Sequence, residues 1–242
     1  MKSEKLSCKH VMLSLFVSIA GAIGGWALTG KLAGDKAALS FLQIGLIIVL
    51  IMTGTQLLFY FLGERRLIHR VLFNIAFGCG YVWFMLCLLL PILWVDKFDI
   101  TFKALLFILL LVLCVANASK AGAQFETKWQ AEGEKALARH YDNNSGSVDW
   151  PKVLAPMRFS VALYIPGVSE RMNPLISVVI LLCMGSGLSF RNAYPIFSLY
   201  AWGAPFCLVI SIFAQVLGLG LAQVMKLVAL EKRFGKAIRP KS

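Results

Sequence analysis

The sequence has few charged residues, and its long hydrophobic runs contain none. Of its 242 residues, 15% are charged and 59% are hydrophobic, whereas a soluble domain has about 25% charged and about 45–50% apolar residues. A soluble core cannot bury that much hydrocarbon, so the composition predicts a membrane protein. Ion-coupled transporters, proton pumps and voltage sensors usually carry ionisable groups inside the membrane, so the uncharged runs disfavour these classes.

The sequence also lacks the patterns of metal and redox chemistry. Six cysteines are present (Cys8, Cys79, Cys87, Cys114, Cys183 and Cys207), and no two form a CxxC pair. The acidic residues are scattered, and the three histidines lie outside the hydrophobic runs. We therefore expect free thiols, no bound metal and no cofactor.

One serine motif is compatible with a membrane enzyme, but it is incomplete. Met184-Gly185-Ser186-Gly187 resembles the Gly-x-Ser-Gly of rhomboid proteases, which are also six-helix proteins with both ends inside. Methionine replaces the first glycine, and no histidine lies within a run to act as general base. We therefore expect no enzymatic activity and expect these small residues to serve helix packing.

The hydrophobic runs predict the fold. A hydrocarbon core of roughly 30 Å needs about 20 apolar residues in a helix, and six uncharged runs meet or approach this length: 11–30, 39–63, 71–95, 104–119, 174–190 and 193–225. The last run is longer than one crossing, and Pro195 and Pro205 predict a broken start before the final helix. We predict an all-α, polytopic membrane bundle of about six transmembrane helices. It divides into residues 1–119 (four helices), 120–173 (a helical cytoplasmic loop) and 174–242 (two helices and a basic tail).

The basic residues predict the orientation. With six crossings, nineteen of the 24 Lys and Arg residues lie on the side that carries both termini, and five lie on the other side (Lys31, Lys36, Lys97, Lys103 and Arg191). Cytoplasmic loops carry the excess of Lys and Arg, so both termini are predicted to be cytoplasmic. Together with the absence of sorting signals, this favours a bacterial inner membrane.

The polar stretch 120–173 is predicted to be a partner-docking region. Residues 120–141 should extend the fourth helix, 142–146 should form a turn, and 153–165 should form a helix lying on the membrane surface. The candidate docking residues are Phe125, Trp129, Leu137 and Arg139.

The basic C-terminal tail is predicted to bind anionic lipid headgroups or an acidic partner. Its basic residues are Lys226, Lys232, Arg233, Lys236, Arg239 and Lys241. No recognition module accompanies this charge, so nucleic-acid binding is not expected.

Two sets of uncharged residues lie inside the runs. Small residues at spacings of three and four predict close helix packing, within this bundle or against other subunits: Ser14, Ser18, Gly21, Gly25, Ala214, Gly218 and Ala222. Neutral polar residues need hydrogen-bond partners in hydrocarbon, and they include Tyr81, Asn117, Gln215 and Gln223. Five others could line a path for a neutral solute: Gln43, Thr53, Thr55, Gln56 and Asn74.

These patterns leave two functional hypotheses open. In the first, the chain is a non-enzymatic membrane protein that acts through contact with another protein or with its own copies, as an assembly subunit or an immunity or exclusion factor. In the second, it is a channel or facilitator for a neutral or weakly polar solute. A continuous polar passage favours the second hypothesis, and a dry bundle favours the first.

Overall fold

The computed structural model describes residues 8–63, 65–96, 98–160, 162–190 and 192–241. The long elements are α1 (Cys8–Ala33), α2 (Asp35–Leu62), α3 (Leu67–Leu89), α4 (Ile100–Lys128), α7 (Asn173–Phe190) and α8 (Pro195–Phe234). In the described chain, six helical stretches are long and apolar enough to cross a membrane. The protein is a multi-pass, α-helical membrane bundle, which confirms the predicted fold class.

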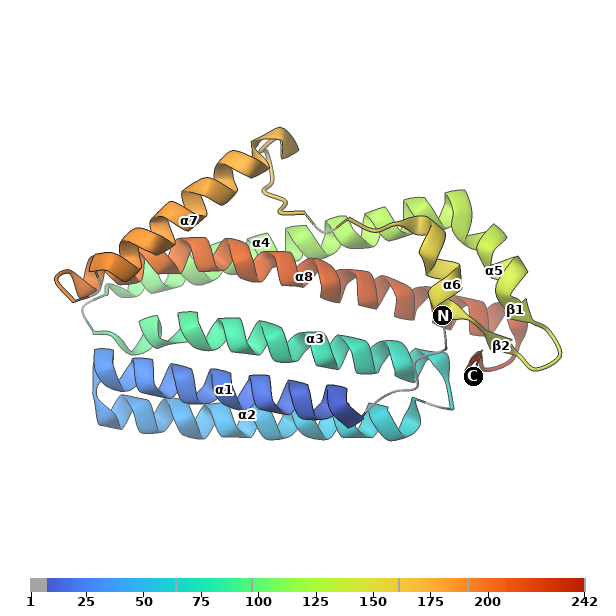
Figure 1. The fold of residues 1–242 in the computed structure, drawn as a ribbon, viewed down its shortest axis with the longest axis horizontal. Helices are drawn as coiled ribbons and strands as arrows, with labels where there is room; N and C mark the ends of the chain where they lie inside the picture. Colours follow the sequence, from blue (N-terminus) through green and yellow to red (C-terminus); the bar gives the residue numbers. More distant parts are fainter. Residues whose placement is uncertain (1–7, 64, 97, 161, 191, 242) are drawn as a thin grey trace.

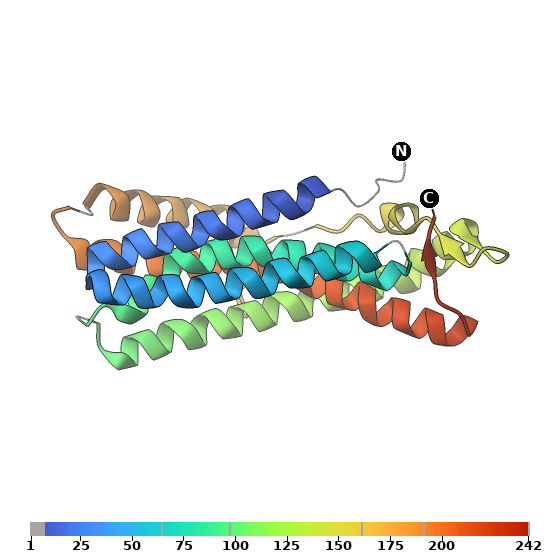
Figure 2. The same cartoon turned by 90° about the horizontal axis from the view of Figure 1, so that it is seen from below.

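The helices form an elongated bundle in which the first described turn of α1 and the last turn of α8 lie toward the same end (Figures 1 and 2). We call this the inner end and the opposite one the outer end. Helices α1 and α2 form an antiparallel pair beside α3, whereas α4 and α8 run in the same direction and pack along much of their length. This arrangement agrees with both ends of the chain lying on one side. Lys2, Lys5, Lys97 and Arg191, which entered the orientation count, lie outside the described residues.

Helix α8 is longer than one membrane crossing. Its 40 residues span about 60 Å at 1.5 Å per residue, about twice the hydrocarbon thickness. Pro195 begins the helix, where a missing N–H is tolerated, and Pro205 lies inside it without ending it. The predicted break at these prolines is therefore wrong, because packed neighbours can tolerate a proline within a membrane helix.

A compact unit closes the inner end, and we call it the inner cap (residues 121–157 and 222–241). It contains the ends of α4 and α8 together with shorter elements: η2 (Trp129–Gly133), α5 (Glu134–His140), β1 (Tyr141–Asp142), β2 (Ser147–Val148), α6 (Trp150–Leu154), η3 (Ala155–Met157) and β3 (Arg239–Pro240). The predicted extension of the fourth helix is confirmed, although a single π-helical turn at η2 interrupts it. The predicted turn at 142–146 is also confirmed, since it joins β1 to β2.

The C-terminal segment closes the cap by backbone hydrogen bonds. The Leu67 N–H donates to the Ile238 carbonyl (2.9 Å), and the Arg239 N–H donates to the Gly146 carbonyl (3.0 Å). Strand β3 pairs in parallel with β2, and the Ile238 side chain has no exposed surface. The end of the chain is thus tied both to the start of α3 and to the β1–β2 hairpin.

The small-residue stripes lie in contacts between helices of this chain. A Cβ added at Gly21 would lie 2.9 Å from the Phe84 Cα, and one added at Gly218 would lie 2.4 Å from the Ala118 carbonyl oxygen. Gly25 similarly approaches α3 and Phe41. The other stripe members are also buried: Ser14, Ser18, Ala214 and Ala222. Backbones therefore meet closely at α1–α3 and at α4–α8, where larger residues have no room.

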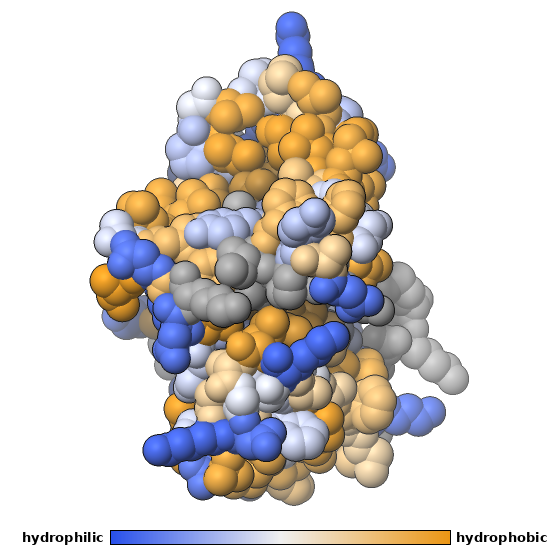
Figure 3. All heavy atoms as spheres, turned by 90° about the vertical axis from the view of Figure 1, so that its left-hand side faces the viewer, coloured by the Kyte–Doolittle hydropathy of each residue, from blue (hydrophilic) through white to orange (hydrophobic). Residues whose placement is uncertain are grey.

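Helix α7 is the least covered span. It packs against α8 near its C-terminal end, where Ser198 Oγ donates to the Gly187 carbonyl (2.7 Å). Gly187 is its buried residue, and most of its other side chains are exposed. At the outer end, hydrophilic residues are scattered among hydrophobic ones (Figure 3). The described charges there balance, with Lys31, Lys36 and Lys103 against Asp35, Asp96 and Asp99.

Candidate functional site

An extended strap, residues 162–169, is held against the bundle by side-chain amides. Asn117 of α4 has no exposed surface. Its Nδ2 donates to the Tyr164 carbonyl (2.8 Å), and its Oδ1 accepts from the Tyr164 N–H (3.2 Å). At the start of α7, Asn173 Nδ2 donates to the Leu163 carbonyl (2.9 Å). The Asn117 amide thus pairs with both the N–H and the carbonyl of one strap residue, as a neighbouring β-strand would.

Gln215 of α8 completes this network. Its Nε2 donates to Asn117 Oδ1 (2.6 Å) and also to the Ala162 carbonyl. Asn117 lies 17 positions after the start of α4, or about 25 Å along the helix, so the network sits near the inner edge of the hydrocarbon. Non-helical backbone is tolerated at such depth only where protein groups satisfy it, and these amides do so.

The strap corrects the prediction of a surface-lying helix over 153–165. Helical structure ends with η3 at Met157, and Arg158 adopts a left-handed conformation (φ 38°) that stops the helix. Beyond it, amides from α4, α7 and α8 supply hydrogen bonds that a helix would have made internally. The strap turns at Pro166-Gly167, where Gly167 has φ 80° and the Val168 N–H donates to the Ile165 carbonyl (3.1 Å).

A shallow, open pocket of about 410 Å³ lies between α4 and the strap. It is lined mainly by apolar surface from Ala116, Ser119, Lys120, Ala123, Tyr164 and Pro166. The Lys120 ammonium lies 4.4 Å from the centroid of the Tyr164 ring and forms an ion pair with Glu170, in η4 (Glu170–Met172). The pocket therefore combines an apolar floor with one cation at its rim.

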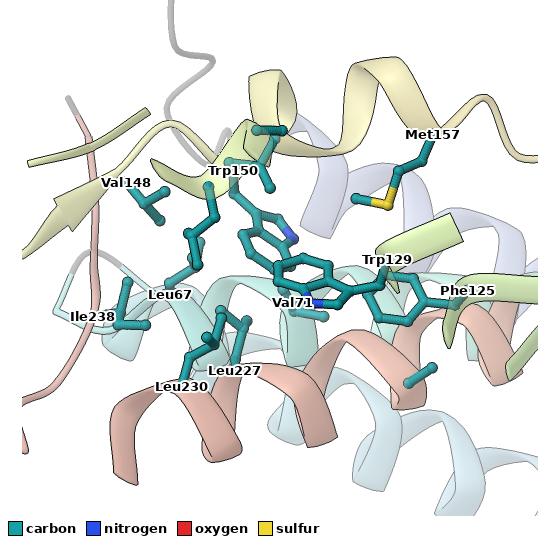
Figure 4. Close-up of a cluster of buried hydrophobic side chains, with 14 residues drawn as sticks. Leu67, Val71, Phe125, Trp129, Val148, Trp150, Met157, Leu227, Leu230 and Ile238 are labelled. Atoms are coloured by element: carbon teal, nitrogen blue, oxygen red, sulfur yellow. The ribbon is translucent and has the colours of Figure 1, made fainter. Parts of the chain in front are cut away.

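The interior of the inner cap is a dense aromatic core. The rings of Trp129 and Trp150 lie 5.7 Å apart, surrounded by side chains from α3, α4, α6, α8 and the C-terminal segment (Figure 4). Trp150 Nε1 donates to Gln223 Oε1 (3.0 Å), and Trp129 Nε1 donates to Glu134 Oε1 (3.2 Å). Elements that are far apart in the sequence thus share one core.

This core corrects three of the predicted docking residues. The side chains of Phe125 and Trp129 are each 1% exposed, and that of Leu137 is 3% exposed. A partner cannot contact side chains that the cap itself covers, so these three residues belong to the core. Arg139 is exposed on α5 and stays a docking candidate.

The inner end is strongly basic. In the described chain it carries seventeen Lys and Arg residues against seven Asp and Glu residues, whereas the outer end is balanced. Lys135 and Arg139 lie one turn apart on α5, and an ion pair between Arg233 and Glu134 (3.1 Å) places the end of α8 beside them. We call the exposed cations Lys135, Arg139, Lys232, Arg233 and Lys236 the basic patch.

The predicted basic tail is part of the folded cap. Lys226 pairs with Glu126 (3.2 Å) and Lys236 Nζ donates to the Asn143 carbonyl (2.7 Å), while Arg239 lies in β3. These contacts order the tail against the rest of the cap, so its cations are presented on a fixed surface. Binding of headgroups by these residues stays a prediction.

Two carboxylates help to fix the hairpin and the start of α6. The pKa of Asp142 is lowered, mainly because Ser145 Oγ donates to it (2.7 Å) and also because the Asn144 N–H does (3.0 Å). The pKa of Asp149 is lowered by its contact with Lys152 (2.7 Å). Both groups therefore favour the folded cap when ionised.

The five residues suggested for a polar path do not come together. Gln43, Thr55 and Asn74 are exposed on the outside of α2 and α3, and the Thr55 hydroxyl donates to its own helix. Thr53 is half-buried, whereas Gln56 is buried with its Nε2 unpaired. Asn117 and Gln215, in contrast, are hydrogen-bonded to each other, and they hold the strap.

The serine motif has a structural explanation. Ser186 Oγ donates to the Cys183 carbonyl (2.8 Å) within α7, and Gly187 meets the Trp202 ring of α8. Among the described residues, no three His, Cys, Asp or Glu side chains are grouped so that they could hold a metal ion.

Comparisons with known protein families, curated protein sequences and solved structures find no match for this chain. The arrangement of its own residues is therefore the basis for the functional proposal.

Sequence reasoning identified Asn117 and Gln215 as amides in need of partners, but it missed Tyr164 and Asn173. Pro166-Gly167 was the available signal, because this pair favours a turn and argues against a continuous helix leading into α7. The backbone acceptors could not be located from side-chain patterns alone.

Proposed function

We propose that this chain is a non-enzymatic, integral inner-membrane protein of a bacterium that acts by contact, using its basic patch to dock an acidic cytoplasmic segment of another protein. The observation that carries the proposal is the inner cap, a closed unit with a large excess of cations on its surface. The excess of Lys and Arg at this end supports a cytoplasmic location for it.

The buried core prepares the basic patch for binding. Trp129 and Trp150 fix α5 and α6 against α8, and the Arg233–Glu134 ion pair ties α8 to α5. A surface ordered before binding loses little conformational entropy when a partner arrives. Charge complementarity then raises the association rate and selects acidic partners.

The channel alternative has less support. Gln43, Thr55 and Asn74 lie on the exposed surface of their helices, where they contact the surroundings of the bundle. Close approaches at Gly21 and Gly218 leave little space between the packed helices. A bundle whose helices pack this closely is better suited to binding another protein at its surface than to conducting a solute.

The test reverses charge on the patch and compares it with the same change elsewhere. Wild-type protein, a Lys135→Glu/Arg139→Glu variant and a Lys36→Glu/Lys103→Glu control at the outer end are purified from native membranes after cross-linking. We expect one polypeptide to co-purify with the wild type and the control, and to decrease at least about tenfold with the patch variant, because like charges at an interface repel.

Two results would overturn the proposal. The first is an identical set of co-purifying polypeptides from all three proteins, with unfolding temperatures that show the cap is intact. The second is flux of a neutral solute through liposomes containing the purified chain, which would support the channel.

A further inference from the structure

We propose that the pocket between α4 and the strap binds the headgroup of an anionic membrane phospholipid. The lining residues are mainly apolar, with Lys120 at the rim. This site is separate from the basic patch, and it concerns the bilayer and not a protein partner.

The depth of the pocket suits a headgroup. Lys120 lies 20 positions after Ile100, the first residue of α4, which is about 30 Å along the helix and equals one hydrocarbon thickness. Ala116 lies one turn deeper and Ala123 almost one turn farther out. The pocket therefore crosses the boundary at which phosphate groups meet acyl chains.

The surroundings of the pocket suit the rest of a phospholipid. The start of α7 stands apart from α4 while its other end meets α8 (Figure 1). Leu175, Val178 and Val179 in this part of α7 are each at least half exposed. The pocket holds a headgroup and glycerol, and the acyl chains lie outside it against apolar surface.

The charge at the rim selects an anion. The Lys120 side chain is 21% exposed, so its stem is packed while its ammonium reaches the Tyr164 ring. Its partner Glu170 is 65% exposed, and such surface pairs contribute little. A lipid phosphate can therefore replace the carboxylate as the main partner of Lys120.

Two further cations lie in the segments next to the site. Lys128, two turns along α4, donates to the Arg158 carbonyl and lies 5.3 Å from the centroid of the Phe159 ring. Arg171 is exposed beside Glu170. Lys120, Lys128 and Arg171 outnumber the acidic Glu170, which favours an anionic over a zwitterionic lipid.

The test measures which lipids the purified chain retains. The protein is incubated with equimolar phosphatidylglycerol and phosphatidylcholine that have identical acyl chains. Native mass spectrometry then counts the lipids of each kind that stay bound. We expect about a fivefold preference for phosphatidylglycerol, the factor that one lysine near a headgroup supplies. Lys120→Gln should lower this preference by about the same factor, and Glu170→Gln should increase it because the competing carboxylate is lost.

The controls separate this site from general attraction. Lys135→Gln removes the same charge from the inner cap and should leave the preference unchanged. Ala116→Trp fills the pocket and should reduce retention of both lipids, with an unchanged unfolding temperature as the check on folding. Equal retention of the two lipids by the wild type, or an unchanged preference in Lys120→Gln, would overturn the proposal.

Discussion

Asn117→Leu is the sharpest perturbation of the strap. Leucine branches at Cγ as asparagine does but has no amide, so the change removes hydrogen bonds and keeps an apolar side chain of similar shape at the site. Four hydrogen bonds are lost: two with the backbone of Tyr164, one to the Leu113 carbonyl and one from Gln215. Hydrogen bonds between membrane helices contribute about 0.6 kcal/mol each on average, and a buried polar group left unpaired costs about 1–3 kcal/mol. We expect a loss of about 2–4 kcal/mol in the free energy of unfolding.

The assay has two readouts. The free energy of unfolding is measured in mixed micelles, and strap release is measured as maleimide labelling of a Leu163→Cys variant in a Cys8→Ser background. Leu163 is 7% exposed, so labelling should be slow until Asn117→Leu frees the strap. Asn74→Leu is the matched control, because Asn74 is exposed on α3. A loss below about 0.5 kcal/mol, within the range of neutral surface changes, together with unchanged labelling would refute the role assigned to Asn117.

Three further predictions concern packing and pH. Gly218→Ala should destabilise by about 1–3 kcal/mol, because its Cβ meets backbone of α4, whereas Gly24→Ala should have little effect, since nothing lies within 4 Å of that Cβ. Trp129→Ala should lower the free energy of unfolding by about 3–5 kcal/mol, because it leaves a cavity in the cap core. Trp26→Ala should lower it much less, because Trp26 is 42% exposed. Chemical unfolding measures all four variants. The pKa of Asp149 is below its ordinary value of 3.8 in the folded cap, so its stabilisation is present at neutral pH and is lost as pH falls below about 4. Asp149→Asn should remove this part of the acid dependence.

The membrane spans follow from the sequence because hydrocarbon imposes a simple physical rule. Uncharged runs of about 20 residues have few alternatives to a membrane helix, and the runs at 11–30 and 71–95 correspond to α1 and α3. Close helix packing at the glycines was also predictable, since Gly21 and Gly218 have no side chain to keep a neighbouring helix backbone away. Which helix provides that backbone depends on tertiary packing and could not be read from spacing.

The site was less predictable because burial and hydrogen bonding depend on distant parts of the chain. Trp129 appears in a polar stretch, which suggested exposure, yet its ring packs against Trp150 within the core of the cap. The strap is apolar enough for a surface helix, but Asn117 and Gln215 supply partners that favour extended backbone. In both cases, residues about 20 to 100 positions away decide the local structure.

The most direct test of the contact proposal is photo-cross-linking in native membranes. A benzophenone amino acid replaces Arg139 in the basic patch or, as a control, Lys36 at the outer end. The proposal predicts one discrete adduct from position 139, absent from position 36 and weakened by added salt. No adduct from position 139, or the same adducts from both positions, would contradict it.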